Sequence, residues 1–454
     1  MRLAGVLCVA ACIAVLAGCG SSGSSGAPGD AAAGSGGSAG SGGSGGSATG
    51  GSAGGAPKDA GQEAAPLPAD CNGSVESTAA PATGLPSAPA LTVPSGFLLE
   101  LIATVPKARQ LAALPNGDLL VGTRGSSVYL VPAADRDSGA GKPVVFTTVN
   151  DSPLQGVAFA GSTCTVYASS QHGIYSIPYK DADTSGPAGN PIAQVRQGGI
   201  PPNSDGDVHK TTSVAFGGGK VYAGVGSSCN ACTEIDPTRA TIQEMDPDGS
   251  NMTTRATRFR NAIALTINPA TGTLWAGGAG QDSLPTGHPY EFFDGVTLHS
   301  GVADYGWPEC EENQHAYVSG ADCSKTVQPL IETPAYSTII GAAFYPAGQS
   351  GAHAFPQSYR GGLFLSVHGS WHKTNGAYYS PPRVAFVKMN GDTPATPVDW
   401  SDPSKQWTEF IGGFQLSDGV TRIARSTGIA VGRDGSLFFA DDSNGYVYRV
   451  RPTS

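Results

Sequence analysis

The side chain best suited to proton transfer in this chain is His209. A free imidazole titrates close to neutral pH, which suits a general base. The histidine comes shortly before the apolar run 213–216, which we expect to form the inner strand of a sheet. A histidine in such a loop can also serve only as a hydrogen-bond partner of the backbone. His209 is therefore a candidate base whose role depends on the residues around it.

A second candidate is the pair Arg260 and Asn261, which follows Phe259 and opens another expected inner strand. A guanidinium is permanently charged and can direct two hydrogen bonds onto a carboxylate or a quinone oxygen. The alternative is a surface arginine in a salt bridge. Other polar side chains border expected strands in the same way: Gln155, Lys373 and Arg425.

Four motifs occur in a fixed order along the chain. They are the runs 209–216 (His-Lys-Thr-Thr-Ser-Val-Ala-Phe), 225–232 (Val-Gly-Ser-Ser-Cys-Asn-Ala-Cys), 259–261 (Phe-Arg-Asn) and 305–310 (Tyr-Gly-Trp-Pro-Glu-Cys). This order resembles the glucose/sorbosone dehydrogenases, sugar-oxidising six-bladed β-propellers that hold pyrroloquinoline quinone (PQQ). The Gly-Ser-Ser-Cys-Asn-x-Cys run is similar to the sorbosone dehydrogenase-like branch. The resemblance extends over roughly residues 93–452.

The resemblance implies a role for each candidate. His209 would take the proton of a sugar hydroxyl while hydride passes to PQQ, and Arg260 would polarise the quinone carbonyl. The other cofactor contacts that it implies are Asn261, Arg425, Lys373 and Gln155. A Ca²⁺ ion would be held largely by backbone carbonyls near Gly280 and Gln281, since Ca²⁺ readily takes main-chain oxygens.

One position departs from the family's glucose-oxidising members, which have an aspartate before the base, whereas this chain has Val208. Asp205 or Asp207 is the candidate substitute. The expected function is a PQQ-dependent sugar dehydrogenase that passes electrons to an external acceptor. Two alternatives stay open: a Ca²⁺-dependent propeller lactonase, and a non-catalytic cell-surface propeller that binds a ligand. The formal net charge of −10 argues against nucleic acid as a partner.

The elements that must position these residues are hairpins. A unit of apolar strand, Gly/Asn/Asp turn and second apolar strand recurs along the chain, with strong turn signals at Asn116-Gly117 and Asp434-Gly435. Copies at wide spacing predict an all-β, six-bladed propeller with about 60 residues per blade. The alternative is a sandwich of two sheets.

The start of the chain reads as a secretory signal. Residues 1–16 form an apolar run too short to span a bilayer, and Leu16-Ala-Gly-Cys19 fits a lipoprotein cleavage site. We expect a signal peptide over 1–18, a lipidated Cys19 with a flexible, disordered Gly/Ser/Ala linker over 19–66, an extension over 67–92 and the propeller over 93–454. The protein would be an extracytoplasmic, membrane-anchored lipoprotein facing the periplasm or in the outer membrane. An ordinary cleaved signal is the alternative.

Six of the nine cysteines lie beyond Cys19. An even number outside the cytosol predicts disulfides. The expected pairs are Cys229–Cys232, Cys310–Cys323 and Cys71–Cys164, although other pairings of six thiols stay open. Thr233 after the Cys-x-x-Cys run argues against a c-type haem site, and no second such run exists to complete a zinc site.

Overall fold

The computed structural model describes residues 66–196, 208–285 and 287–453. These residues belong to one unit, Glu63–Ser454. The predictions for the signal peptide, Cys19 and the linker up to residue 65 lie outside the described residues, as do Asp205 and Asp207. No helix in the described ranges has the length and apolar character that a bilayer span requires.

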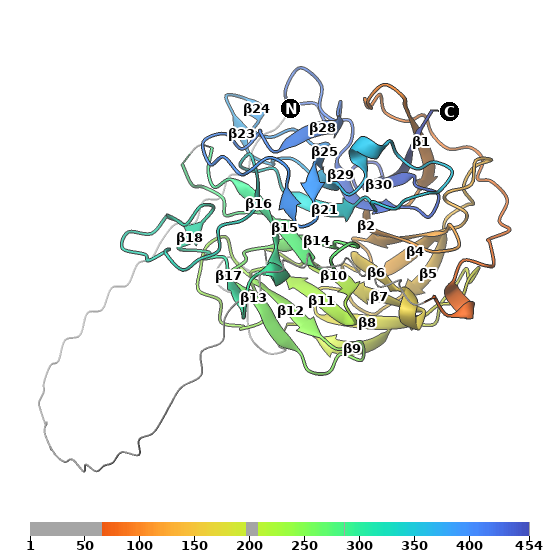
Figure 1. Ribbon diagram of the computed structural model, residues 1–454, viewed down its shortest axis with the longest axis horizontal. Helices are drawn as coiled ribbons and strands as arrows, with labels where there is room; N and C mark the ends of the chain where they lie inside the picture. Colours follow the sequence, from red (N-terminus) through yellow and green to blue (C-terminus); the bar gives the residue numbers. More distant parts are fainter. Residues whose placement is uncertain (1–65, 197–207, 286, 454) are drawn as a thin grey trace, which may run out of the picture. The chain divides into compact units, whose positions relative to one another are not determined.

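Strands dominate the described residues, and they form six main sheets that we call blades 1 to 6 (Figure 1). Blade 1 contains β2 (Ala108–Ala113), β3 (Leu119–Thr123), β4 (Ser127–Val131) and β5 (Val144–Thr148). Blade 2 contains β6 (Gly156–Ala160), β7 (Thr165–Ser169), β8 (Gly173–Pro178) and β9 (Asn190–Gln194). Blade 3 contains β10 (Thr212–Gly217), β11 (Lys220–Val225), β12 (Thr241–Met245), β13 (Thr253–Thr257) and the short parallel β17 (Ala303–Asp304).

The other three blades follow the same plan. Blade 4 contains β14 (Ala262–Ile267), β15 (Leu274–Gly278), β16 (Glu291–Gly295) and β20 (Ile331–Thr333). Blade 5 contains β21 (Ile339–Phe344), β22 (Leu363–Val367), β25 (Arg383–Val387) and β28 (Trp407–Ile411). Blade 6 contains β29 (Ser426–Val431), β30 (Leu437–Asp441), β31 (Tyr446–Pro452) and the N-terminal strand β1 (Phe97–Thr104).

The ring is closed by pairing between the two ends of the propeller. Strand β1 pairs antiparallel with β31, so the last blade is completed by the first strand of the chain. The first strands of the six blades contact one another in turn around the centre, where Figure 1 shows β2, β6, β10, β14, β21 and β29. Their approach is close: a Cβ at Gly428 of β29 would overlap the carbonyl of Arg109 in β2. The predicted six-bladed, all-β propeller is confirmed.

The two hairpin signals occupy the predicted turns. Asn116 and Gly117 lie between β2 and β3, and Gly117 has a φ of 90°. Asp434 and Gly435 lie between β29 and β30, and Gly435 has a φ of 89°. Glycine adopts a positive φ without steric cost. These two dipeptides can therefore form the tight turns that connect one strand to the next.

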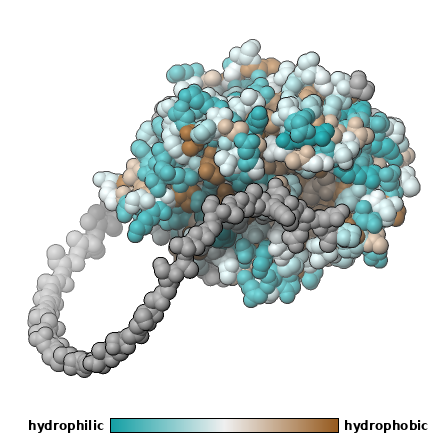
Figure 2. All heavy atoms as spheres, in the orientation of Figure 1, coloured by the Kyte–Doolittle hydropathy of each residue, from teal (hydrophilic) through white to brown (hydrophobic). Residues whose placement is uncertain are grey.

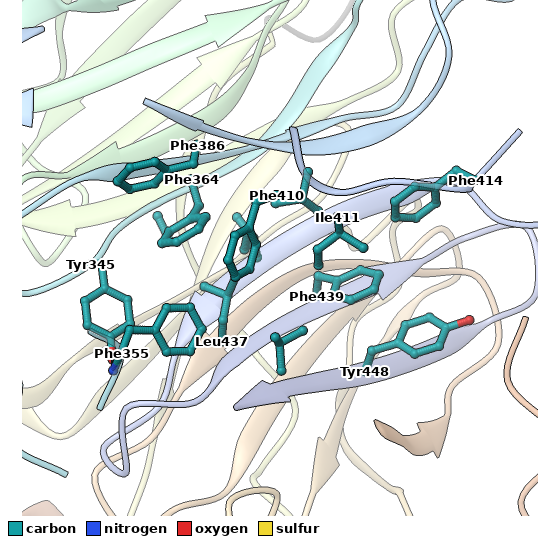
Figure 3. Packing of buried hydrophobic residues seen from close by; sticks show 14 of the residues in the cluster. Tyr345, Phe355, Phe364, Phe386, Phe410, Ile411, Phe414, Leu437, Phe439 and Tyr448 are labelled. Carbon is teal, nitrogen blue, oxygen red and sulfur yellow. The ribbon is translucent and has the colours of Figure 1, made fainter. Parts of the chain in front are cut away.

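The hydrophobic core is divided among the interfaces between neighbouring blades. Figure 3 shows one such cluster, in which Phe364 and Phe410 of blade 5 meet Phe439 and Tyr448 of blade 6. Trp275 of β15 is fully buried and contributes to the equivalent cluster between blades 4 and 5. The outer face visible in Figure 2 carries mainly polar residues with scattered apolar ones.

All three predicted disulfides are present. Cys71–Cys164 ties the segment before β1 to blade 2, which it reaches across a sequence separation of 93 residues. Cys310–Cys323 closes the loop that carries the small hairpin of β18 (Cys310–Glu311) and β19 (His315–Ala316). Cys229–Cys232 closes a short loop after β11.

Candidate active site

Most of the sequence-predicted polar residues lie at one end of the ring. Each stands just before the first strand of a blade: Gln155 before β6, His209 before β10, Arg260 and Asn261 before β14, and Arg425 before β29. The second strand of each blade is antiparallel to the first, so it ends where the first begins. We call this end of the ring the mouth.

Two adjoining cavities open at the mouth. One of about 390 Å³ is lined by His209, Arg260, Asn261 and Gly280, among others, and we call it the Arg260 cavity. The other, of about 470 Å³, also includes His209 and Asn261 and is bordered by Arg109; we call it the Arg109 cavity. The candidate base and the candidate quinone-polarising cation therefore face the same space, although 51 positions separate them in the chain.

Arg260 is buried, which rules out the alternative of a surface salt bridge. Its Nε donates to the Asn230 carbonyl at 3.0 Å, and its Nη2 donates to Asn230 Oδ1 at 2.8 Å and to Asp282 Oδ2 at 3.0 Å. Its Nη1 donates to the carbonyls of Ala279 and Gly280. All five N–H donors of the guanidinium thus have protein acceptors. In this arrangement Arg260 acts on the cavity through its charge.

The ring of His209 is fixed by Ser227, which sequence reasoning did not single out. Nδ1 lies 2.8 Å from Ser227 Oγ and 3.2 Å from the Ser227 carbonyl. Because Ser227 Oγ gives its hydrogen to the Cys229 carbonyl at 2.7 Å, the imidazole Nδ1 must donate. In the neutral ring, Nε2 then carries the lone pair that a base needs. Ser227 therefore orients the imidazole of His209.

Cations surround the Arg109 cavity. Arg109, Arg124 and Lys210 line it. Arg425 lies next to it, donating from Nε to the His368 carbonyl at 3.1 Å and from Nη2 to the Gly369 carbonyl at 2.9 Å. Burial, with the nearby charge of Arg422, lowers the pKa of Arg425 to about 10, so the guanidinium stays charged at neutral pH.

A buried hydrogen-bond network, which sequence reasoning missed, holds residues that line the Arg109 cavity. Asp442, just after β30, accepts from Arg109 Nη1 at 2.9 Å and lies 3.0 Å from Nε2 of His368, which lines the cavity. Burial lowers the pKa of His368 to about 4, so its imidazole is neutral at neutral pH. The sequence feature that could have indicated this network is the acidic pair Asp441-Asp442 at the end of a strand.

Gln155 and Lys373 are placed differently. The side chain of Gln155 is buried, and neither its Nε2 nor its Oε1 has a hydrogen-bond partner among the described residues. Its neighbours Ser152 and Pro153 line the Arg109 cavity. Lys373 is exposed on β23 (Lys373–Thr374), with Nζ 4.7 Å from the centre of the Tyr378 ring, and it does not line either cavity. Its predicted contact with a cofactor stays a prediction.

The predicted metal loop is flanked by two buried carboxyls that sequence reasoning missed. Gly280 lines the Arg260 cavity, and the backbone N–H of buried Gln281 donates to Glu311 Oε1 at 3.2 Å. Burial raises the pKa of Glu311 to about 8, an effect that the charge of Arg260 offsets only in part. Burial also raises the pKa of Glu291 well above its usual range. Acidic oxygens are thus available beside the loop.

Comparisons with known proteins agree with this architecture. A family model described as TrAA12-like matches residues 302–453. The chain shares 16% identity and a TM-score of 0.63 with the holo form of the pyranose dehydrogenase PQQ domain from Coprinopsis cinerea, over 80% of this chain and 97% of that one. It shares 17% identity and a TM-score of 0.64 with the calcium structure of a Trichoderma reesei carbohydrate-active enzyme of family AA12, over 80% and 98% of the two chains.

A structure named glucose dehydrogenase shares 17% identity and a TM-score of 0.55, over 79% of this chain and 99% of that one. A curated relative, an uncharacterised protein of Borreliella burgdorferi, is 24% identical over 195 residues, which are 42% of this chain and 46% of that protein. The match thus spans less than half of that relative. At these identities the structural likeness shows the fold. The chain has the same propeller fold as solved structures named pyranose dehydrogenase and glucose dehydrogenase, which is the fold that the motifs predicted.

Proposed function

We propose that this protein is a PQQ-dependent sugar dehydrogenase that removes hydride from a sugar hydroxyl carbon or an aldehyde hydrate. The observation that carries the proposal is the shared cavity of His209 and Arg260, an oriented base beside a buried cation. The names of the solved structures that share the fold favour the same reaction class.

The donor set at the mouth fits a cofactor with three carboxylates. Arg109, Arg124, Lys210 and Arg425 gather there although the whole chain has a formal charge of −10. Guanidinium and ammonium groups are the side chains that bind carboxylates best. The buried amide of Gln155 offers a donor and an acceptor that no described residue uses, and its chain neighbours Ser152 and Pro153 line the Arg109 cavity although Gln155 does not. Asn261 adds a further amide to both cavities.

The chain's own residues would handle the proton and the developing charge. His209 Nε2 would accept the hydroxyl proton, and Ser227 would hold the ring as it becomes charged. The permanent charge of Arg260 would stabilise negative charge that develops in the cavity. PQQ, when bound, supplies the two-electron acceptor for the hydride, and an external acceptor must then reoxidise it.

A Ca²⁺ ion at the predicted loop would share oxygen atoms with Arg260. The carbonyls of Ala279 and Gly280 accept hydrogen bonds from Arg260, so an ion at these oxygens would compete with that guanidinium. Ca²⁺ takes carboxylate oxygens, so the carboxyl of Glu311 beside Gln281 would have to lose its proton to bind the ion.

We also propose that the enzyme works outside the cytoplasm, anchored by a lipid on Cys19. The three disulfides support this location, because such bonds persist in oxidising compartments. Metabolic labelling with a fatty acid tests the anchor: the wild type is expected to take up label and Cys19→Ser is not. Equal labelling of both proteins would refute it.

Reconstitution of the full chain tests the enzymatic proposal. We expect saturable PQQ binding, measured by absorbance, and dye reduction with a panel of sugars in the presence of PQQ and Ca²⁺. His209→Ala and Arg260→Ala should each lower kcat at least about 100-fold. His172→Ala is the matched control, since His172 is exposed, pairs with Asp151 and lines neither cavity. Absence of PQQ binding, or lactone hydrolysis without PQQ, would overturn the proposal.

A further inference from the structure

We propose that Asn230, in the loop closed by the Cys229–Cys232 disulfide, is the positioning residue that sets the candidate base and the candidate cation relative to each other. The inference rests on the proposed function for its catalytic meaning. The positioning role itself depends only on the hydrogen bonds of this loop.

Asn230 contacts Arg260 twice. Its backbone carbonyl accepts from Arg260 Nε at 3.0 Å and its side-chain Oδ1 accepts from Arg260 Nη2 at 2.8 Å. One residue therefore supplies acceptors to two of the three nitrogens and fixes the plane of the guanidinium. The same carbonyl also accepts from Trp307 Nε1 at 3.1 Å, so it is held from a second side.

The amide of Asn230 also holds the carboxylate that pairs with Arg260. Oδ1 accepts from the backbone N–H of Asp282 at 2.8 Å, and Nδ2 donates to the Asp282 carbonyl at 3.0 Å. Asp282 in turn places Oδ2 at 3.0 Å from Arg260 Nη2. The side chain of Asn230 thus bridges a cation and the segment that carries its counter-charge, a contact that needs both a donor and an acceptor.

The same loop reaches the base. The carbonyl of Cys229 accepts from Ser227 Oγ, and Ser227 Oγ is the atom that accepts from His209 Nδ1. Cys229 is buried and packs with Ala240 and Trp307. The residues between the cysteines form no helix or strand, so the Cys229–Cys232 disulfide is the covalent restraint on the conformation of the short loop that carries Asn230.

Two readouts separate positioning from general stability. Asn230→Ala, reconstituted with PQQ, is expected to lower kcat by about 10- to 100-fold, the usual range for a residue that orients a functional group. KM for the sugar should change less than about threefold, since the residue acts through Arg260. In the Arg260→Ala background the same substitution should have no further effect on kcat. Asn268→Ala is the control, because Asn268 is a buried asparagine that joins blades 4 and 5 away from both cavities.

The second readout needs no cofactor and no turnover. In the apo protein, modification of Arg260 by phenylglyoxal, mapped by peptide mass spectrometry, should be at least about tenfold faster in Asn230→Ala than in the wild type or Asn268→Ala. Cys229→Ser/Cys232→Ser should resemble Asn230→Ala. Equal modification rates in all four proteins would overturn the inference, whatever the enzyme assay shows. If the rates differ as expected and no variant oxidises sugars, the proposed function fails and the positioning role stands.

Discussion

Glu311 gives the sharpest test of the electrostatics around the predicted metal loop. Burial raises the pKa of Glu311 from 4.5 to about 8, so the folded protein holds a proton that the unfolded chain releases. A raised pKa of this kind stabilises the fold at low pH, and that contribution is lost as the pH rises from 4.5 through about 8. At about 1.36 kcal/mol per pKa unit, burying the ionisable group costs about 1 kcal/mol at pH 5 and about 4 kcal/mol at pH 8.

Glu311→Gln removes this titration while keeping an oxygen for the backbone N–H of Gln281. The free energy of unfolding, measured by urea denaturation, should therefore favour the variant over the wild type by about 3 kcal/mol more at pH 8 than at pH 5. Glu309→Gln is the matched control, because Glu309 is exposed and pairs with Arg258; its difference from the wild type should not change with pH in this way. A difference for Glu311→Gln that stays constant to within about 0.5 kcal/mol would refute the reasoning.

Three further predictions concern stability and the cofactor. Gln155→Leu should raise the apo protein's free energy of unfolding by about 1 kcal/mol, because it removes an unpartnered buried amide. The same substitution should weaken PQQ binding in a titration. A loss of apo stability would show that the amide has a partner. Cys71→Ser/Cys164→Ser should lower the free energy of unfolding by about 4 kcal/mol in urea, given the 93-residue separation, and an unchanged urea midpoint would contradict this. Because burial lowers the pKa of His368 from 6.5 to about 4, the neutral imidazole contributes stability above pH 6.5, and the protein's free energy of unfolding falls by about 3 kcal/mol as the pH falls to 4. His368→Gln keeps a donor for Asp442 and should make the free energy of unfolding less dependent on pH in this range.

The propeller was predictable from the sequence because its signals are local. Asn116-Gly117 and Asp434-Gly435 each indicate a hairpin from a few residues alone. The repetition of this hairpin unit along the chain predicts the ring of blades. The position of His209 before an inner strand is also a local feature. The chain order of the motifs supplied the family resemblance.

The partners of these residues could not be read from local patterns. Ser227 reaches His209 from 18 positions away, and Asp442 joins Arg109 across 333. Such pairs depend on which strand ends meet at the mouth, which the sequence does not state. Glu311 belongs to an acidic run of residues 309, 311 and 312, which gives no sign of burial, yet the fold buries it against Gly280 and Gln281. Burial, and hence its raised pKa, is a property of the folded ring.

The mouth contains two arrangements in which an aspartate lies between an arginine and a histidine. Asp282 pairs with Arg260 at 3.0 Å and with His372 at 2.9 Å. Asp442 does the same for Arg109 at 2.9 Å and His368 at 3.0 Å. Both aspartates follow the second strand of a blade and so occupy equivalent positions in the repeat, whereas both histidines come from the single loop after β22.

This pairing changes which cations can serve an anionic ligand. Arg260 and Arg109 each already have a carboxylate within hydrogen-bond distance, which offsets part of their charge. Arg425 instead donates to backbone carbonyls, while Arg124 and Lys210 lie exposed along the Arg109 cavity. Among the described residues, these last three are the cations of the mouth that have no carboxylate at hydrogen-bond distance. In the proposed function, the carboxylates of PQQ would therefore be bound on the Arg109 side, which would leave the Arg260 side, with His209 at its border, to the reacting carbon.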